Sequence, residues 1–270
     1  MSDRPVYESI TLEREGGVCR LTLARPDTLN ALTHAMMVEI GDAVDRIARD
    51  QTCRIVVLRG AGGNFCAGGD INAMKSIPPP PRPGEEDPLY APYRLFGDVL
   101  QALDGLPQAV VALVEGAAVG GGLGMVCCAD AVIVRADAKF GIPEPRAGFI
   151  PSQMIPFLIR RVGPGRARHL AVTSDRIDGR EAHRIGLADR CCEDAASLEA
   201  ALAETLTSIL GSAPGAVATV KRLIVESEGR PLEEILDAAG KALVERLRSP
   251  DAAEGMAAFL EKRTAQFKHR

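Results

Sequence analysis

Two aliphatic runs, each followed at once by a glycine-rich segment, constrain the fold of this chain more than any other feature. Residues 55–58 precede the segment 60–70, and residues 109–114 precede the segment 116–124. Neither run alternates with polar residues, so both predict strands that are buried on both faces. Glycines in the following segments let main-chain N–H groups approach a bound oxygen closely. The pattern therefore predicts a core that presents backbone donors at two strand ends.

The segments around these runs indicate an α/β fold. Residues 19–23 alternate apolar and polar, which is typical of a half-buried strand. A helix of about 16 residues is predicted after Thr33, whose hydroxyl suits the N-cap. From residue 195 onward the apolar spacing is helical throughout. We therefore expect an α/β core over residues 1–194 and a helical region over residues 195–270.

Composition and charge exclude several functional classes. The chain has 270 residues, 46% of them hydrophobic, and a formal net charge of −4 with its charges interspersed, which argues against nucleic-acid binding. No apolar run reaches the roughly 18 residues that a membrane span needs. The seven cysteines form no C-x-x-C pair and the four histidines are scattered, so we expect no metal site. The odd cysteine count and the absence of a signal-like segment favour a cytoplasmic location.

A proline-rich segment, residues 77–92, does not suit a core. It contains four consecutive prolines, Pro78 to Pro81, which impose extended geometry and remove backbone donors. Two interpretations remain open, a surface loop and a lid over the ligand site.

Five motifs occur in an order that resembles the enoyl-CoA hydratase/isomerase (crotonase) superfamily, and they occupy residues 24–32, 64–71, 120–122, 140–144 and 259–263. The resemblance implies a spiral of ββα repeats that carries the ligand site over residues 1–194, followed by a helical oligomerisation region over residues 195–270 that mediates trimerisation, often as a dimer of trimers. It also implies an acyl-CoA thioester as substrate, with coenzyme A entering as part of that substrate and no separate cofactor.

The resemblance assigns site residues. The two oxyanion donors would be the backbone N–H groups of Ala67 and Gly121. Substrate binding would involve Ala31, Gly121 and the unpaired N–H groups at the start of a helix, those of Ala67, Gly68, Gly69 and Asp70. Phe259 and Lys262 would reach a CoA group bound to another subunit, although a solvated lysine is an equal alternative.

The acid–base residues depart from the hydratase pattern. Hydratases of this superfamily usually carry two glutamates; one matches Glu144, and the position of the other is Gly124. A single carboxylate suffices for hydration of a 2-enoyl-CoA and for double-bond isomerisation. Thioester hydrolysis is less favoured, because Ser152 stands where the hydrolases carry aspartate. We expect a hydratase-like lyase, with an isomerase as the alternative and a non-catalytic acyl-CoA-binding scaffold as a different class.

Residues 144–157 are similar to hydratases that act on glutaconyl-type CoA esters. Arg146 could pair with a carboxylate of such a substrate or lie exposed. Gln153 could bind the substrate or face solvent.

The helices after residue 195 carry more apolar surface than short helices can bury on one another. Because the resembling family trimerises through this region, we predict a homotrimer or a hexamer of two trimers, held through residues that include Leu198, Leu202, Leu206, Leu210, Ile235, Leu236, Leu243, Leu247, Met256 and Phe259.

Overall fold

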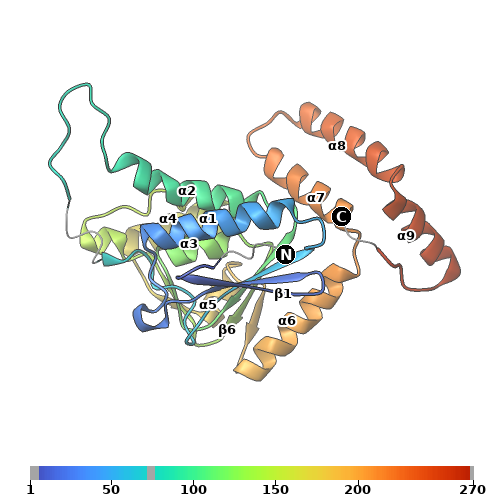
Figure 1. Ribbon diagram of the computed structural model, residues 1–270, viewed down its shortest axis with the longest axis horizontal. Coiled ribbons are helices and arrows are strands. Elements are labelled where there is room, and N and C mark those ends of the chain that lie inside the picture. Colours follow the sequence, from blue (N-terminus) through green and yellow to red (C-terminus); the bar gives the residue numbers. More distant parts are fainter. Residues whose placement is uncertain (1–5, 72–76, 268–270) are drawn as a thin grey trace.

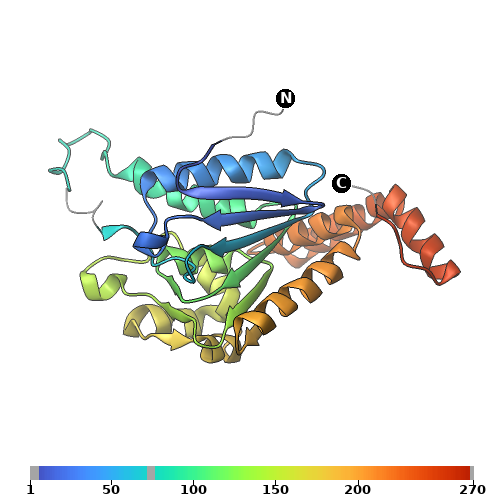
Figure 2. The same ribbon diagram turned by 60° about the horizontal axis from the view of Figure 1, so that its bottom comes forward.

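A computed structural model describes residues 6–71 and 77–267 and shows two sheets (Figures 1 and 2). The larger has the strand order β1-β2-β3-β4-β6-β9 and is parallel except for the β1–β2 pair. Its strands are β1 (Ile10–Glu15), β2 (Val18–Leu23), β3 (Ile55–Gly60), β4 (Ala109–Val114), β6 (Ala131–Arg135) and β9 (Arg190–Cys192). The smaller sheet joins β5 (Ala117–Val119), β7 (Lys139–Gly141) and β8 (Ile177–Asp178).

Helices cover both faces of the larger sheet. One face packs on α1 (His34–Arg49), α2 (Tyr90–Asp104), α3 (Gly121–Cys127) and α4 (Ile155–Thr173). The other face packs on α6 (Ala195–Leu210), and α5 (Gly179–Arg184) lies beside β8 and β9. Alternate residues of β3 point to opposite faces, with Val56 and Leu58 on one side and Ile55 and Val57 on the other. The prediction of strands buried on both faces is confirmed.

The predicted helix after Thr33 is confirmed as α1. The hydroxyl oxygen of Thr33 accepts a hydrogen bond from the Met36 N–H at 3.2 Å, which satisfies a donor of the first turn. The buried residues Met36, Ile40, Val44 and Ile47 follow helical spacing toward the sheet.

The helix α6 belongs to the core by its packing. Leu198 and Leu202 are buried against β3, β4 and β6, so the sheet supplies the apolar partner that the sequence led us to expect from another subunit. All elements after residue 195 in the described chain are helices, as predicted, but separation from the body begins after α6 rather than at residue 195. The predicted assignment of α6 to the oligomerisation region is corrected in this respect.

The last three helices leave the body. Helix α7 (Pro214–Glu226) is anchored by Lys221, whose Nζ donates to the Gln108 carbonyl at 2.6 Å and pairs with Asp130 at 2.5 Å. Helices α8 (Leu232–Leu247) and α9 (Pro250–Glu261), which we call the wing, extend away from the sheets (Figures 1 and 2). Several apolar side chains of the wing are exposed, Phe259 to 84%.

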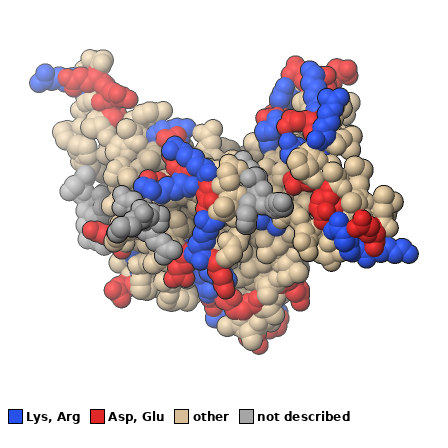
Figure 3. All heavy atoms as spheres, turned by 45° about the vertical axis from the view of Figure 1, so that its right-hand side comes forward, with Lys and Arg blue, Asp and Glu red and all other residues tan. Residues whose placement is uncertain are grey.

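The proline-rich segment is described from residue 77 onward. Most of residues 77–89 are exposed and without regular structure, and they project from the body before α2 begins at Tyr90 (Figure 1). The lid stays a prediction. Acidic and basic side chains are mixed over the face in Figure 3. Among the described helices, none is long and apolar enough to cross a membrane.

Candidate active site

The two glycine-rich segments meet at β5. The Cys66 N–H donates to the Ala117 carbonyl at 2.7 Å, and the Val119 N–H donates to the Cys66 carbonyl at 2.9 Å. The first segment therefore lies along one edge of β5, while β7 pairs with the other edge. Because β5 leads through Gly120 into α3, both strand ends deliver their loops to one place.

The structure corrects the assignment of Ala67 as an oxyanion donor. Its backbone N–H donates to the Leu29 carbonyl at 3.0 Å and so is engaged within the protein. The Gly68 N–H contacts the Cys66 sulfur at 3.4 Å, and the Asp70 N–H donates to the Leu32 carbonyl at 2.9 Å. The expectation of a run of unpaired donors at a helix start is wrong for these three groups.

Gly69 differs from its neighbours because of a parallel bridge. The Leu32 N–H donates to the Gly68 carbonyl, and the Leu32 carbonyl accepts from the Asp70 N–H. Leu32 therefore pairs with the residues on both sides of Gly69, and in this parallel bridge the Gly69 N–H points away from Leu32. No acceptor among the described residues takes this N–H, and Gly69 is exposed. The Gly69 N–H is therefore available to a ligand.

Gly121 supplies the second available donor. It is the first residue of α3, whose first-turn N–H groups have no partner within the helix. No described acceptor takes the Gly121 N–H either. Two donors on two loops therefore remain, those of Gly69 and Gly121.

The Glu144 carboxylate lies beside these loops. Glu144 begins a short 3-10 helix after β7, and its Oε1 lies against Gly120, where any Cβ would collide with it. Gly120 also has a φ of +52°, which favours glycine. The Glu144 Oε2 is buried without a hydrogen-bond partner. Burial raises the pKa of Glu144, partly offset by a hydrogen bond with its own backbone.

An apolar wall stands where a second acid would be. A Cβ at Gly124 would lie 2.9 Å from the Met154 Cβ and 3.4 Å from both Leu100 Cδ1 and Phe96 Cζ. The Phe96 ring also faces Gly121, together with Leu32. The site therefore offers one carboxylate, and apolar side chains fill the space opposite Gly124.

This packing determines what a glutamate placed at position 124 would do. Gly124 lies outside the left-handed region, but the close approach of Met154 leaves no room for a side chain. We expect Gly124→Glu alone to lose about 1–3 kcal/mol of stability through overpacking. The double variant Gly124→Glu/Met154→Ala should recover it and hydrate crotonyl-CoA faster than Met154→Ala alone. Thermal unfolding and the rate of crotonyl-CoA hydration check this. A Gly124→Glu single variant that is as stable as the wild type would contradict the expected overpacking.

Of the other residues predicted to bind substrate, some lie close together and some lie at the opposite end of the molecule. Arg25 links Ala31 to Asp70, since its guanidinium donates to the Ala31 carbonyl and pairs with the Asp70 carboxylate at 3.4 Å. Phe259 and Lys262 lie in or directly after α9, at the end of the molecule opposite α3 (Figure 1). They therefore lie apart from the loops that carry Gly69 and Gly121.

Two further residues considered as substrate contacts, Arg146 and Gln153, have neighbours within the protein instead. The exposed Arg146 donates to the Thr173 carbonyl at 3.3 Å, so the structure gives no support to a role beside Glu144. Gln153 is half-buried rather than facing solvent, and its Oε1 lies over Gly97 of α2, a glycine that Arg94 Nη1 also approaches.

Sequence reasoning missed the apolar wall, and it assigned the Gly69 N–H to substrate binding without pairing it with the Gly121 N–H. The helical spacing of Phe96, Leu100 and Leu103 is a signal for an apolar helix face, but the spacing alone does not show which of these residues turn toward Gly124. Within the described part of the chain, no three His, Cys, Asp or Glu side chains cluster as a metal site would require.

Comparisons with known proteins agree with this geometry. Residues 13–270 match the family model described as enoyl-CoA hydratase/isomerase. The chain is 33% identical to crotonyl-CoA hydratase of Syntrophomonas wolfei, over 97% of this chain and 98% of the relative. It is 32% identical to 1,2-epoxyphenylacetyl-CoA isomerase of Escherichia coli, over 97% and 99%.

Solved structures show the same fold. Pseudomonas aeruginosa AtuE superposes with a TM-score of 0.90 at 42% identity, covering 96% of this chain and 98% of that one. An enoyl-CoA hydratase/isomerase from Marinobacter aquaeolei gives 0.89 at 36% identity, covering 96% and 98%. A family-model match over nearly the whole chain, with relatives above 30% identity, is decisive. The chain belongs to the enoyl-CoA hydratase/isomerase (crotonase) family.

Proposed function

We propose that this protein is a hydratase-like lyase that adds water across the 2,3 double bond of an acyl-CoA thioester. One observation carries the proposal: the Glu144 carboxylate lies beside the loops that present the Gly69 and Gly121 N–H groups, and its Oε2 has no hydrogen-bond partner among the described residues. Relatives named as crotonyl-CoA hydratase and enoyl-CoA hydratase support the reaction class.

The donors act on the thioester carbonyl. When a nucleophile adds to the β-carbon, the electron pair of the double bond moves to the α-carbon and the carbonyl oxygen becomes an enolate oxygen. Two preorganised N–H groups, those of Gly69 and Gly121, stabilise that negative charge more than they stabilise the ground state. Removal of one such donor typically costs about 2.7–4 kcal/mol.

Glu144 moves the proton. As a carboxylate it takes a proton from water while the hydroxyl oxygen bonds to the β-carbon. The protonated Glu144 then returns that proton to the α-carbon, which collapses the enolate to the saturated thioester. Water is consumed, and the carboxylate is regenerated without a second acid.

Isomerisation of a 3-enoyl-CoA to a 2-enoyl-CoA is the second candidate, and the apolar wall opposite Gly124 favours it. In that reaction Glu144 removes a proton from the α-carbon and returns it to the γ-carbon, and no water is needed. Phe96, Leu100 and Met154 present no polar group that would hold a second water ligand.

An absorbance assay separates the two reactions. A panel of 2-enoyl-CoAs, including branched glutaconyl-CoAs, should lose the absorbance of the conjugated thioester on hydration. A matching panel of 3-enoyl-CoAs gains the same band if the enzyme isomerises them. Gain on the second panel without loss on the first would replace the hydratase proposal with the isomerase one, and no change on either would support a non-catalytic acyl-CoA-binding scaffold.

Lys262 is proposed to contact a CoA group bound to another copy. A single exposed cation contributes at most about 1 kcal/mol, so Lys262→Ala should weaken CoA-ester binding by no more than about fivefold, with the difference lost at high salt. Titration calorimetry at low salt measures this, with Lys241→Ala on the exposed face of α8 as the matched control. Equal affinity of the Lys262 and Lys241 variants would refute the contact.

A further inference from the structure

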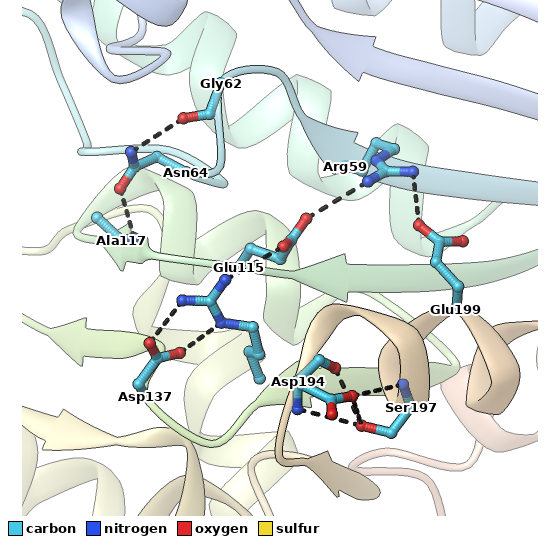
Figure 4. Close-up of polar contacts among 10 residues, drawn as sticks. Arg59, Gly62, Asn64, Glu115, Ala117, Asp137, Asp194, Ser197 and Glu199 are labelled. Carbon is cyan, nitrogen blue, oxygen red and sulfur yellow. Dashed lines mark hydrogen bonds and ion pairs between the residues drawn. The ribbon is translucent and has the colours of Figure 1, made fainter.

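Asn64 joins the two loops that carry the oxyanion donors. It follows β3, and its Oδ1 accepts a hydrogen bond from the Ala117 N–H at 3.0 Å, at the first residue of β5 (Figure 4). Its Nδ2 contacts the Gly62 carbonyl at 3.5 Å. The Asn64 side chain therefore spans from the first glycine-rich segment to β5, which lies within the second.

The backbone around Asn64 is shaped for this contact. Gly116 has a φ of +55°, and a Cβ there would collide with both the Gly63 carbonyl and the Asn64 Oδ1. The chain before β5 can approach Asn64 so closely because this residue is glycine. Nearby, the Glu115 carboxylate pairs with Arg59 at 3.4 Å (Figure 4). It also pairs with Arg135 at 3.5 Å, so the two ion pairs join β3 to the ends of β4 and β6.

A second asparagine fixes the position of Asn64 itself. Asn30 is fully buried, and its Nδ2 donates to the Asn64 carbonyl at 2.7 Å and to the Ala61 carbonyl at 2.9 Å. Its Oδ1 accepts from the Arg25 N–H at 2.9 Å. Asn64 is therefore held by a polar group whose own hydrogen bonds are satisfied, and it can act as a rigid support.

The strand that Asn64 holds is central to the site. The segment with Gly69 lies on one edge of β5, and β7, which leads to Glu144, lies on the other. Beyond its end, the Gly120 N–H donates to the Gly141 carbonyl at 2.9 Å, and Gly121 follows. A shift of β5 relative to Asn64 would therefore change the spacing between the Gly69 and Gly121 donors.

We propose that Asn64 is a positioning residue, which sets the spacing of the two oxyanion donors through the Ala117 N–H. It touches no reacting atom in this role. The inference rests on the proposed function for the identity of the ligand. Its physical basis is that oxyanion stabilisation depends on donors already placed at the position of the developing charge, so that small displacements are costly.

The test uses a saturated acyl-CoA carrying 13C at the thioester carbonyl, which binds without reacting. Hydrogen bonds from the donors polarise this carbonyl and move its NMR signal downfield. Asn64→Asp keeps an oxygen that accepts from Ala117 and loses the amide that contacts Gly62, whereas Asn64→Ala loses both. We expect Asn64→Asp to retain most of the downfield displacement and Asn64→Ala to lose at least about half of it.

Kinetics on the reactive substrate provide the second readout. We expect Asn64→Ala to lower kcat by about 10- to 100-fold while KM changes by less than about threefold, and Asn64→Asp to stay within about threefold of the wild type in both. If Asn64→Ala does not fold, Asn64→Ser takes its place, because its shorter side chain does not span the gap and the same losses are expected.

The outcomes separate this proposal from the proposed function. A wild-type complex without any downfield displacement would remove the oxyanion site, and with it the role of Asn64. Displacement in the wild type that Asn64→Ala, or Asn64→Ser, fully retains would overturn the role of Asn64 alone. Equal losses in Asn64→Asp and Asn64→Ala would also overturn it, because the acceptor to Ala117 would then not be the group that matters.

Discussion

Replacing Glu144 with glutamine is expected to lower turnover by at least about two orders of magnitude and to leave CoA-ester affinity largely intact. The amide keeps the shape of the side chain but cannot accept the proton that either proposed reaction transfers. Steady-state kinetics and direct binding measurements check both parts. Glu13→Gln, a similar change on the exposed face of β1, is the control and should keep wild-type rates. Wild-type turnover in the Glu144 variant would eliminate the assignment of the base.

The pH dependence of wild-type catalysis should reflect the burial of Glu144. Burial raises the pKa of Glu144, so the carboxylate needed as a base forms at higher pH than in an exposed glutamate. The acidic limb of kcat/KM should therefore lie above the ordinary glutamate pKa and disappear in Glu144→Gln. If the acidic limb persists unchanged in Glu144→Gln, the limb reports the titration of another group.

Stability should move in the opposite direction to activity. Because the folded-state pKa is raised, the native protein holds a proton that the unfolded chain has already released, and stability falls as pH rises through this window. Above it, the wild type contains a buried charge that the glutamine variant lacks. We therefore expect Glu144→Gln to unfold at the same or a higher temperature at pH 8, which also shows that lost activity is not lost folding.

A second large effect is expected from the wing. We propose that the protein is a homotrimer or a dimer of trimers, because the wing exposes Leu236 to 59%, Leu243 to 60% and Phe259 to 84%, while α7 is the main described element outside the wing on which it packs. Leu236→Asp/Leu243→Asp should dissociate the assembly into 28.6 kDa monomers and lower activity more than about tenfold, since Phe259 and Lys262 would no longer reach another active site.

Sedimentation equilibrium at micromolar concentration measures the assembly directly. Val38→Asp, on an exposed position of α1 outside the wing, is the matched control and should keep the wild-type mass. A stable, active wild-type species of 28.6 kDa would contradict the proposed assembly and the role of Phe259 and Lys262 in a neighbouring site.

The sequence by itself determined the elements whose signals are local. Unbroken aliphatic runs marked β3 and β4, because a strand buried on both faces has no polar positions. Thr33 marked the start of α1, because an N-cap needs a side-chain oxygen at one position. The order of short motifs also placed Glu144 in the site, since it identified the family without any knowledge of contacts.

Tertiary structure decided which backbone groups are available and which surfaces are covered. Ala67 and Gly69 are two residues apart in one glycine-rich segment, yet the Ala67 N–H is taken by the Leu29 carbonyl and the Gly69 N–H is not. Likewise, the leucines of α6 and the apolar residues of α8 have similar spacing, but only those of α6 meet the sheet. A pattern of side chains records which residues need a partner. The partner itself, and the direction of each N–H, depend on segments far away in the chain.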